Sequence, residues 1–322
     1  MNPAAKITAF TAALAVSFGA AYGVGLAAGP EDGSTASPKR SGHAESSTSR
    51  AEEGPTGPPA GGLQVTEGGY TLDLRNPRVK AGQRSDLRFA VRDRAGRQVT
   101  DFQREHGKEL HLILASRDLA TYRHLHPVRA ADGTWSTPVA LPAAGDYRVF
   151  ADFTPGGGSA TGLTLGADLA ASGPYEPAEL PKPAATASVD GYTVSLNGTL
   201  RPDAPERLVF TVRKDGRPVT GLQPYLGAYG HLVALRAGDL AYAHVHPEAD
   251  PGDGPRKRGP HVSFTATAPG SATYRLFLDF KHDGKVRTAA FTVPSGATAQ
   301  EPRQAEPSGG HEDGPSDGGH GH

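Results

Sequence analysis

Three histidines recur twice in this sequence at one constant spacing. HLILASRDLATYRHLHP at residues 111–127 returns as HLVALRAGDLAYAHVHP at residues 231–247. The repeated residues are His111, His124 and His126 in the first copy and His231, His244 and His246 in the second, at an offset of 120. Imidazole nitrogens are the commonest protein ligands of transition metals. Because the whole set is repeated, we interpret it as a metal-binding pattern.

Each copy is typical of a β-hairpin, since two short apolar runs flank a polar break. A loop centred on Arg117 and Asp118 places His111 directly opposite His124, and side-chain alternation puts His126 on the same face. The second copy has the same pattern around Ala237 and Gly238, and it predicts His231 opposite His244, with His246 beside them. An odd loop length would shift this register. We therefore expect three imidazoles to converge in each copy.

A carboxylate is expected beside each set of histidines. Asp152 lies in YRVFADF and Asp279 lies in the matching YRLFLDF. In an immunoglobulin-like sandwich the strand with Asp152 would lie beside the strand with His111. Three histidines with one carboxylate suit Cu(II) or Zn(II), with the aspartate as a ligand or as a hydrogen-bond acceptor behind one. We expect acid to release the metal near pH 6, as free imidazoles protonate.

Short runs of alternating apolar and polar residues, separated by turn residues, are predicted to be the strands that position these histidines and aspartates. Seven such runs fall between residues 63 and 170, with no helical period, and the lone Trp135 is expected in the core. Residues 188–295 repeat the pattern, so that DGYTVSL at 190–196 matches GGYTLDL at 68–74. We predict an all-β fold, with two tandem immunoglobulin-like antiparallel β-sandwiches after an N-terminal apolar helix.

The remaining segments differ in composition. Residues 1–29 include an uncharged apolar stretch at 7–28 and are predicted to be a membrane anchor or signal peptide. Residues 30–62 and 296–322 are predicted to be a disordered linker and a disordered, histidine-containing tail, and residues 171–187 a Pro-rich linker. We expect a single-pass protein of the cell membrane with extracytoplasmic domains, or a secreted protein.

Composition excludes several classes of function. The 322 residues include no cysteine and one methionine, which rules out disulfides, thiolate catalysis, cysteine-based zinc sites and iron–sulfur clusters. The net charge of −1 gives no electrostatic reason to expect nucleic acid. The sequence has no G-x-S-x-G, P-loop or H-E-x-x-H motif. We therefore expect a protein that is not an enzyme.

The motif HL, then DL, Y, H-x-H-P and YR-x-F-x-DF resembles that of exported bacterial tandem β-sandwich proteins, and is similar to the YtkA-like and CopC-like copper-associated sandwiches. The resemblance covers residues 63–170 and 188–295. It implies an extracytoplasmic, copper-related binding role without enzymatic turnover, such as metal delivery or buffering.

Two other interpretations stay open. The outward faces of the two repeats are apolar enough to bind another membrane or envelope protein, as in a scaffold, or to pack against each other. These faces carry Ile113, Tyr122 and Phe150 in the first repeat and Val233, Tyr242 and Phe277 in the second. His244, His246 and Glu248 also resemble a cupin metal motif, which would indicate a cupin-like metalloenzyme, although Val128 occupies the position of Glu248 in the first copy.

Overall fold

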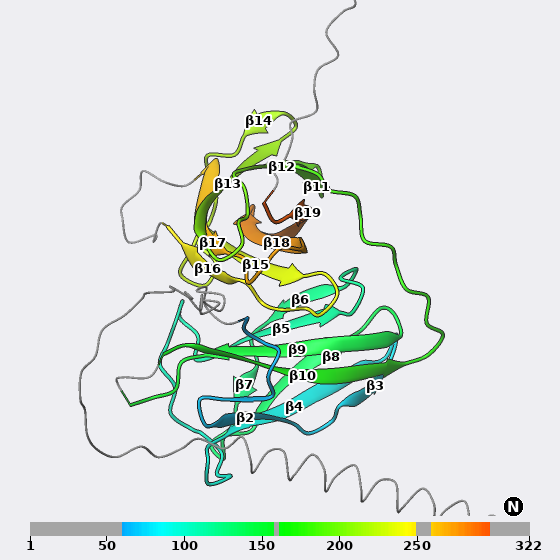
Figure 1. Cartoon of the computed structure of the whole chain (residues 1–322), viewed down its shortest axis with the longest axis vertical. Coiled ribbons are helices and arrows are strands. Elements are labelled where there is room, and N and C mark those ends of the chain that lie inside the picture. The colour runs from blue at the N-terminus through cyan, green and yellow to red at the C-terminus, as the bar shows by residue number, and fades with distance from the viewer. Residues whose placement is uncertain (1–59, 158–160, 249–258, 297–322) are drawn as a thin grey trace, which may run out of the picture. The chain divides into compact units, whose positions relative to one another are not determined.

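The computed structural model describes residues 60–157, 161–248 and 259–296, which form strands joined by turns (Figure 1). The first part of the chain forms two five-stranded sheets. One sheet has the order β1 (Thr66–Glu67), β2 (Tyr70–Leu74), β4 (Arg84–Arg92), β8 (Trp135–Ala140) and β7 (Val128–Arg129). The other has the order β3 (Arg78–Lys80), β10 (Leu163–Ser172), β9 (Gly145–Phe153), β5 (His111–Ser116) and β6 (Tyr122–Leu125). We call this pair of sheets the first sandwich.

The second sandwich is built from the later strands. One sheet has the order β11 (Thr186–Val189), β12 (Tyr192–Asn197), β13 (Pro205–Lys214), β17 (His261–Thr267) and β16 (His244–Pro247), with β14 (Arg217–Pro218) paired to β13. The other has the order β15 (Gly230–Arg236), β18 (Thr273–His282) and β19 (Lys285–Pro294). The predicted all-β fold with antiparallel sheets is confirmed, except that β3 pairs with β10 in parallel.

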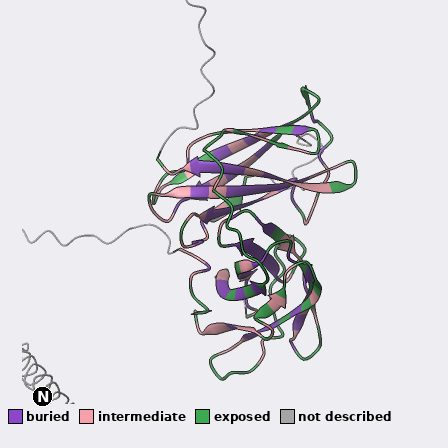
Figure 2. Ribbon diagram, turned by 90° about the vertical axis from the view of Figure 1, so that its right-hand side faces the viewer, coloured by how far each residue is buried: buried purple, intermediate pink, exposed green. Residues whose placement is uncertain are grey.

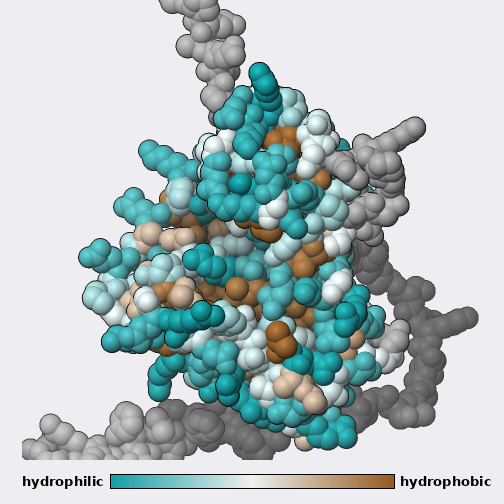
Figure 3. Space-filling model, turned by 180° about the vertical axis from the view of Figure 1, so that it is seen from behind, coloured by the Kyte–Doolittle hydropathy of each residue, from teal (hydrophilic) through white to brown (hydrophobic). Residues whose placement is uncertain are grey.

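Alternation along the strands explains how each sandwich encloses a core. Tyr147, Val149 and Ala151 of β9 pack inside the first sandwich with Trp135, which is 3% exposed, as predicted. The second sandwich has an equivalent core that includes Tyr274, Leu276 and Leu278 of β18. Figure 2 shows the buried positions recurring along the strands of both sandwiches. On the face drawn in Figure 3 hydrophilic side chains predominate.

A third apolar cluster joins the two sandwiches. The opposite face of β5 contributes Ile113, and β15 and β18 contribute Val233 and Phe277. The rings of Tyr122 and Phe277 are stacked, with centres 4.2 Å apart and planes at 6°. The apolar faces predicted to be contact surfaces therefore pack against each other, and their side chains are buried or half-buried within the chain itself.

The hairpin register differs from the prediction. Ile113, not His111, lies opposite His124. The turn is centred between Asp118 and Leu119, because the Asp118 carboxylate accepts hydrogen bonds from the Ser116 hydroxyl and the Ala120 amide while Leu119 adopts a φ of 60°. The resulting shift of two residues preserves which side chains share a face.

The second copy departs further, because its hairpin opens. β15 pairs with β18, whereas β16 crosses to the other sheet, where His244 lies opposite Thr267 and His246 opposite Thr265. Only the isolated bridge between Leu235 and Tyr242 keeps the hairpin pairing among the described residues. The prediction that His231 lies opposite His244 is wrong.

Parts of the predicted linkers are ordered. Gly61 accepts a hydrogen bond from the Tyr242 amide and the Gly62 amide donates one to Thr164, so these two residues are held by both sandwiches. Leu180, in the Pro-rich segment 171–187, packs against the third apolar cluster. The predicted N-terminal apolar helix, residues 30–59 of the linker and residues 297–322 of the tail lie outside the described residues. Within the described residues, no helix is long and apolar enough to cross a membrane.

Candidate metal centre

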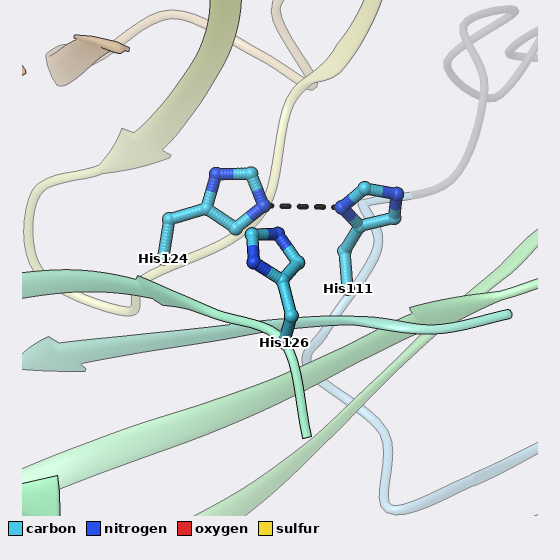
Figure 4. Close-up of side chains that lie close together, drawn as sticks. All are labelled: His111, His124 and His126. Carbon is cyan, nitrogen blue, oxygen red and sulfur yellow. Dashed lines mark hydrogen bonds between the residues drawn. The ribbon is translucent and has the colours of Figure 1, made fainter. Parts of the chain in front are cut away.

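His111, His124 and His126 converge at the end of the hairpin formed by β5 and β6. Each offers one ring nitrogen, and these three nitrogens all lie within 4.8 Å of one another. Figure 4 shows the rings turned toward a common point. The directly opposed pair was predicted wrongly, but the register shift is of two residues. The three histidines therefore still share one face and converge.

The hydrogen bonds of two rings determine which nitrogens carry protons. His111 Nε2 lies 3.2 Å from the carbonyl oxygen of Glu105, and His124 Nδ1 lies 3.0 Å from Oδ2 of Asp279. A carbonyl or carboxylate oxygen only accepts, so both of these nitrogens donate. In neutral rings, His111 Nδ1 and His124 Nε2 are then unprotonated, and these two atoms face each other at 3.1 Å.

His126 supplies a third nitrogen without a partner. Its Nε2 is buried and makes no hydrogen bond in the structure. The ring centres of His126 and His124 are 4.9 Å apart, and those of His126 and His111 are 5.6 Å apart. Burying a polar atom without a partner is costly, and in the tautomer protonated at Nδ1 this nitrogen has a free lone pair for a cation.

The carboxylate that orients His124 comes from the other sandwich. Asp279 is 1% exposed, and it also accepts hydrogen bonds from the Tyr122 hydroxyl at 3.3 Å and the Thr288 hydroxyl at 2.5 Å. Asp279 was predicted to serve the histidines of its own repeat. Its backbone does lie opposite His231, but its carboxylate reaches across to His124.

Asp152 lies directly opposite His111 on β9, so the predicted pairing of their strands is confirmed. Its Oδ1 accepts a hydrogen bond from the Thr164 hydroxyl at 3.0 Å. Burial raises the pKa of Asp152 to about 6. The side chain lines the same pocket as His111 and His124.

Two further histidines approach from the side. The ring of His231 lies 5.6 Å from that of His124 and 6.1 Å from that of His111, measured between centres. The exposed His106 lies 5.5 Å from His231. Comparison of the two copies gave no signal for His106, because Leu226 occupies its position in the second copy. Both residues take a left-handed conformation, with φ of 52° and 50°, which identifies the same turn in each repeat.

His246, which was also predicted for the second site, does not gather with His231. The backbone of β16 places His246 in the sheet with β17, and Val245 beside it packs toward the core, so alternation turns His246 to the outer face of that sheet. Only the backbone of His244 is described. The Glu248 carboxylate accepts hydrogen bonds from Arg207 and Thr265.

Burial also determines the protonation of the cluster. It lowers the pKa of His111 to about 3, with a further lowering from the neighbouring His124, and it lowers the pKa of His126 and of His231 to about 4. These three rings are therefore neutral at pH 7, which is the form that binds a metal.

A pocket of about 90 Å³ opens beside the cluster, between the sandwiches. His106, His111, His124 and Asp152 line it from the first sandwich, and the second contributes His231, Tyr242 and apolar residues. The arrangement can hold a small cation among neutral imidazoles, with two carboxylates close enough to balance part of its charge.

Comparisons with known proteins show the same duplication. The family described as "Domain of unknown function (DUF8832)" matches residues 64–164 and again residues 187–297. No curated protein matches the chain.

Some solved structures have a distant likeness. The chain is similar to FdeC, an Escherichia coli adhesin, at 17% identity and a TM-score of 0.23, over 72% of this chain and 65% of that one. It is also similar to InvD of Yersinia pseudotuberculosis, at 15% identity and a TM-score of 0.23, over 76% and 62%. For invasin, a bacterial integrin-binding protein, the identity is 13% and the TM-score 0.20, over 71% and 40%. The chain spans less than two thirds of the length of each.

Proposed function

We propose that this chain, which belongs to the family described as a domain of unknown function (DUF8832), binds a divalent transition metal, Cu(II) or Zn(II). In this proposal the ligands are His111, His124 and His126. In this proposal the protein buffers or delivers the metal outside the cytoplasm and catalyses no reaction. The apolar segment at residues 7–28 supports export or membrane anchoring. The strand orders of the two sandwiches support immunoglobulin-like modules as the scaffold.

The observation that carries the proposal is the close approach of His111 Nδ1 and His124 Nε2, which face each other at 3.1 Å and are both unprotonated when the two rings are neutral. Two lone pairs at this distance repel unless something positive lies between or beside them. With metal–nitrogen distances of 2.0–2.1 Å, two ligand nitrogens of a tetrahedral site lie about 3.3 Å apart. The spacing in the protein is close to that value, and the unpartnered Nε2 of His126 lies in the same cluster.

Outer-sphere hydrogen bonds support the same interpretation. A ligand histidine commonly donates its second N–H to a carboxylate or a backbone carbonyl, which selects the tautomer and orients the ring. His124 does so to Asp279, and His111 does so to Glu105. The rings are thus held with their free nitrogens inward before a metal arrives.

A second arrangement of protons would satisfy the facing nitrogens without a metal. An imidazolium at His124, paired with Asp279, could donate its Nε2 proton to His111. The cluster would then be a polar network that holds the sandwiches together. The two possibilities differ in metal affinity, which the experiment below measures.

No described contact favours the scaffold or the cupin interpretation. The apolar residues that suggested a partner surface pack within the chain, and Glu248 is bonded to Arg207 and Thr265.

The expectation of metal release by acid near pH 6 assumed imidazoles with ordinary pKa values. Because burial lowers the pKa of His111, His126 and His231, we now place release below that pH.

The test is calorimetric titration of the full chain with Cu(II) and with Zn(II), in the wild type, His124→Ala and the control His261→Ala. His261 is an exposed histidine of β17 whose ring bonds to Thr211, so it controls for general loss of an imidazole. All three proteins keep the same tail, so any difference in binding between them arises outside the tail. We expect a tight site in the wild type and His261→Ala that His124→Ala lacks. Equal binding by all three proteins would overturn the proposal.

A further inference from the structure

The position of His231 suggests that the second sandwich completes the metal site. In a tetrahedral site of four imidazoles, each ring centre lies roughly 3.2 Å from the metal, so ring centres lie about 5.2 Å apart. The rings of His111, His124 and His126 have centres 4.9, 5.3 and 5.6 Å apart. The His231 ring lies 5.6 Å from that of His124 and 6.1 Å from that of His111, close to the distance expected for a fourth ligand.

The hydrogen bond of His231 leaves the right nitrogen available. Its Nε2 lies 2.7 Å from the carbonyl oxygen of Tyr225 and must donate to it, so Nδ1 of the neutral ring keeps its lone pair. His111 makes the same bond to Glu105, and in each case the acceptor lies six residues before the histidine. The two repeats thus prepare equivalent histidines in the same way.

The contact between the sandwiches holds His231 near the cluster without a metal. Val233, two residues further along β15, packs in the apolar cluster with Ile113 of β5. Asp279, which lies opposite His231 on β18, already bonds to His124. These contacts hold the His231 ring beside those of His111 and His124 in the metal-free protein.

We propose that the protein has one metal site shared by its two sandwiches, in which His231 of the second joins His111, His124 and His126 of the first. This inference rests on the proposed function above. It replaces the expectation of one separate site in each repeat. The bound ion would then join β15 directly to β5 and β6 and would strengthen the contact between the sandwiches.

The inference also narrows the choice of metal. A closed set of four neutral nitrogens is the geometry of a structural zinc site, whereas Cu(II) prefers tetragonal arrangements. We therefore expect Zn(II), with Co(II) as its spectroscopic substitute, to occupy the shared site in tetrahedral coordination.

The experiment titrates the full chain with Co(II) and with Zn(II) in the wild type, His231→Ala, His124→Ala and His246→Ala. His246 is the matched control, because it is a histidine of the same cassette in the same sandwich that lies in the other sheet. We expect one tight equivalent in the wild type and His246→Ala, with the intense visible bands of tetrahedral Co(II). His231→Ala should still bind, but at least roughly tenfold more weakly and with the weaker bands of a site that has taken up water.

Two outcomes separate this inference from the proposed function. If His231→Ala keeps the affinity and the Co(II) spectrum of the wild type while His124→Ala loses binding, the shared site is overturned and the three-histidine site stands. If His124→Ala binds as the wild type does, both are overturned. Circular dichroism of the metal-free variants shows whether each is folded, and His231→Gln, which preserves a polar side chain, replaces His231→Ala if that variant unfolds.

Discussion

Asp279, on β18 of the second sandwich, accepts a hydrogen bond at 3.0 Å from Nδ1 of His124, on β6 of the first. The two side chains are 1% and 6% exposed, so the bond is shielded from water. It links residues 155 positions apart in the chain and sets the orientation of a candidate ligand. The candidate metal centre and the contact between the sandwiches therefore share the same pair of residues.

Replacing Asp279 should weaken metal binding without removing a candidate ligand. Asp279→Asn leaves an amide that can hold His124 in the wrong tautomer, and the loss of such an outer-sphere partner typically costs roughly 10–100-fold in affinity. Competition with a chromophoric chelator for Zn(II) measures the change. Asp168→Asn is the control, because it makes the same change at an exposed carboxylate that pairs with Arg148 outside the cluster. An Asp279→Asn protein with wild-type affinity would contradict the role given to this carboxylate.

Tyr122 is expected to contribute to stability through its ring and its hydroxyl separately. Tyr122→Ala removes the stack on Phe277 and leaves a cavity in the apolar cluster, which should lower the free energy of unfolding by about 3–5 kcal/mol. Tyr122→Phe removes only the hydrogen bond to Asp279 and should cost about 1–2 kcal/mol. Guanidinium unfolding of the metal-free proteins measures both. Equal losses in the two variants would show that the stack contributes little.

The stability of the metal-free protein should fall in mild acid. The pKa values of His111, His126 and His231 are about 3, 4 and 4 in the folded protein, below the value of about 6.5 in the unfolded chain. Between those values the unfolded chain binds more protons, so stability is fully present above about pH 6.5 and is lost as the pH falls toward 4.

Asp152 acts in the opposite direction over part of this window. Its folded pKa of about 6 lies above the unfolded value of about 3.9, so its protonation in the folded state offsets part of the loss from one histidine. Denaturant unfolding at a series of pH values tests the net effect. We expect a decline from pH 6.5 to 4 that is shallower in His111→Gln, and a flat profile in the wild type would refute the burial of neutral histidines.

We expect substitution of Gly62 to lower stability, because the backbone there passes close to the ring of Phe150. Its φ is 73°, and a Cβ at this position would overlap the ring of Phe150. Gly82 has a φ of 74° with nothing near its would-be Cβ, so Gly82→Ala carries the backbone strain alone. Thermal unfolding should show Gly62→Ala to be less stable than Gly82→Ala by about 1–3 kcal/mol. Equal stabilities would mean that residues 60–62 move away from Phe150 at little cost.

Local patterns in the sequence were enough to predict the strands and their faces. Alternation in β5 and β9 separated the core side, with Leu112 and Val149, from the side that carries His111 and Asp152. It also predicted that His111, His124 and His126 share a face, because a strand has a side-chain period of two whatever its register. The recurrence of the cassette predicted the tandem repeat, which the double family match supports.

The exact register depended on a turn that the pattern did not specify. Hydrogen bonds from Asp118 and the positive φ of Leu119 moved the turn by one residue and the pairing by two. The second cassette looked equivalent in sequence, yet its last strand pairs with β17 in the other sheet. An edge strand joins one sheet or the other according to the strands that are available beside it in the fold. The alternation of side chains along the strand carries no information about that choice.

Only the tertiary structure determined which residues belong to the candidate metal centre. The sequence by itself determined that two sets of histidines and carboxylates would be presented on matching strand faces. It assigned Asp279 and His231 to their own repeat, because sequence spacing relates residues within a repeat. In the folded protein the apolar faces of the two repeats bury each other, and this contact carries Asp279 to His124 and His231 to the edge of the cluster. Burial of apolar surface between distant segments therefore determined which side chains form the candidate centre.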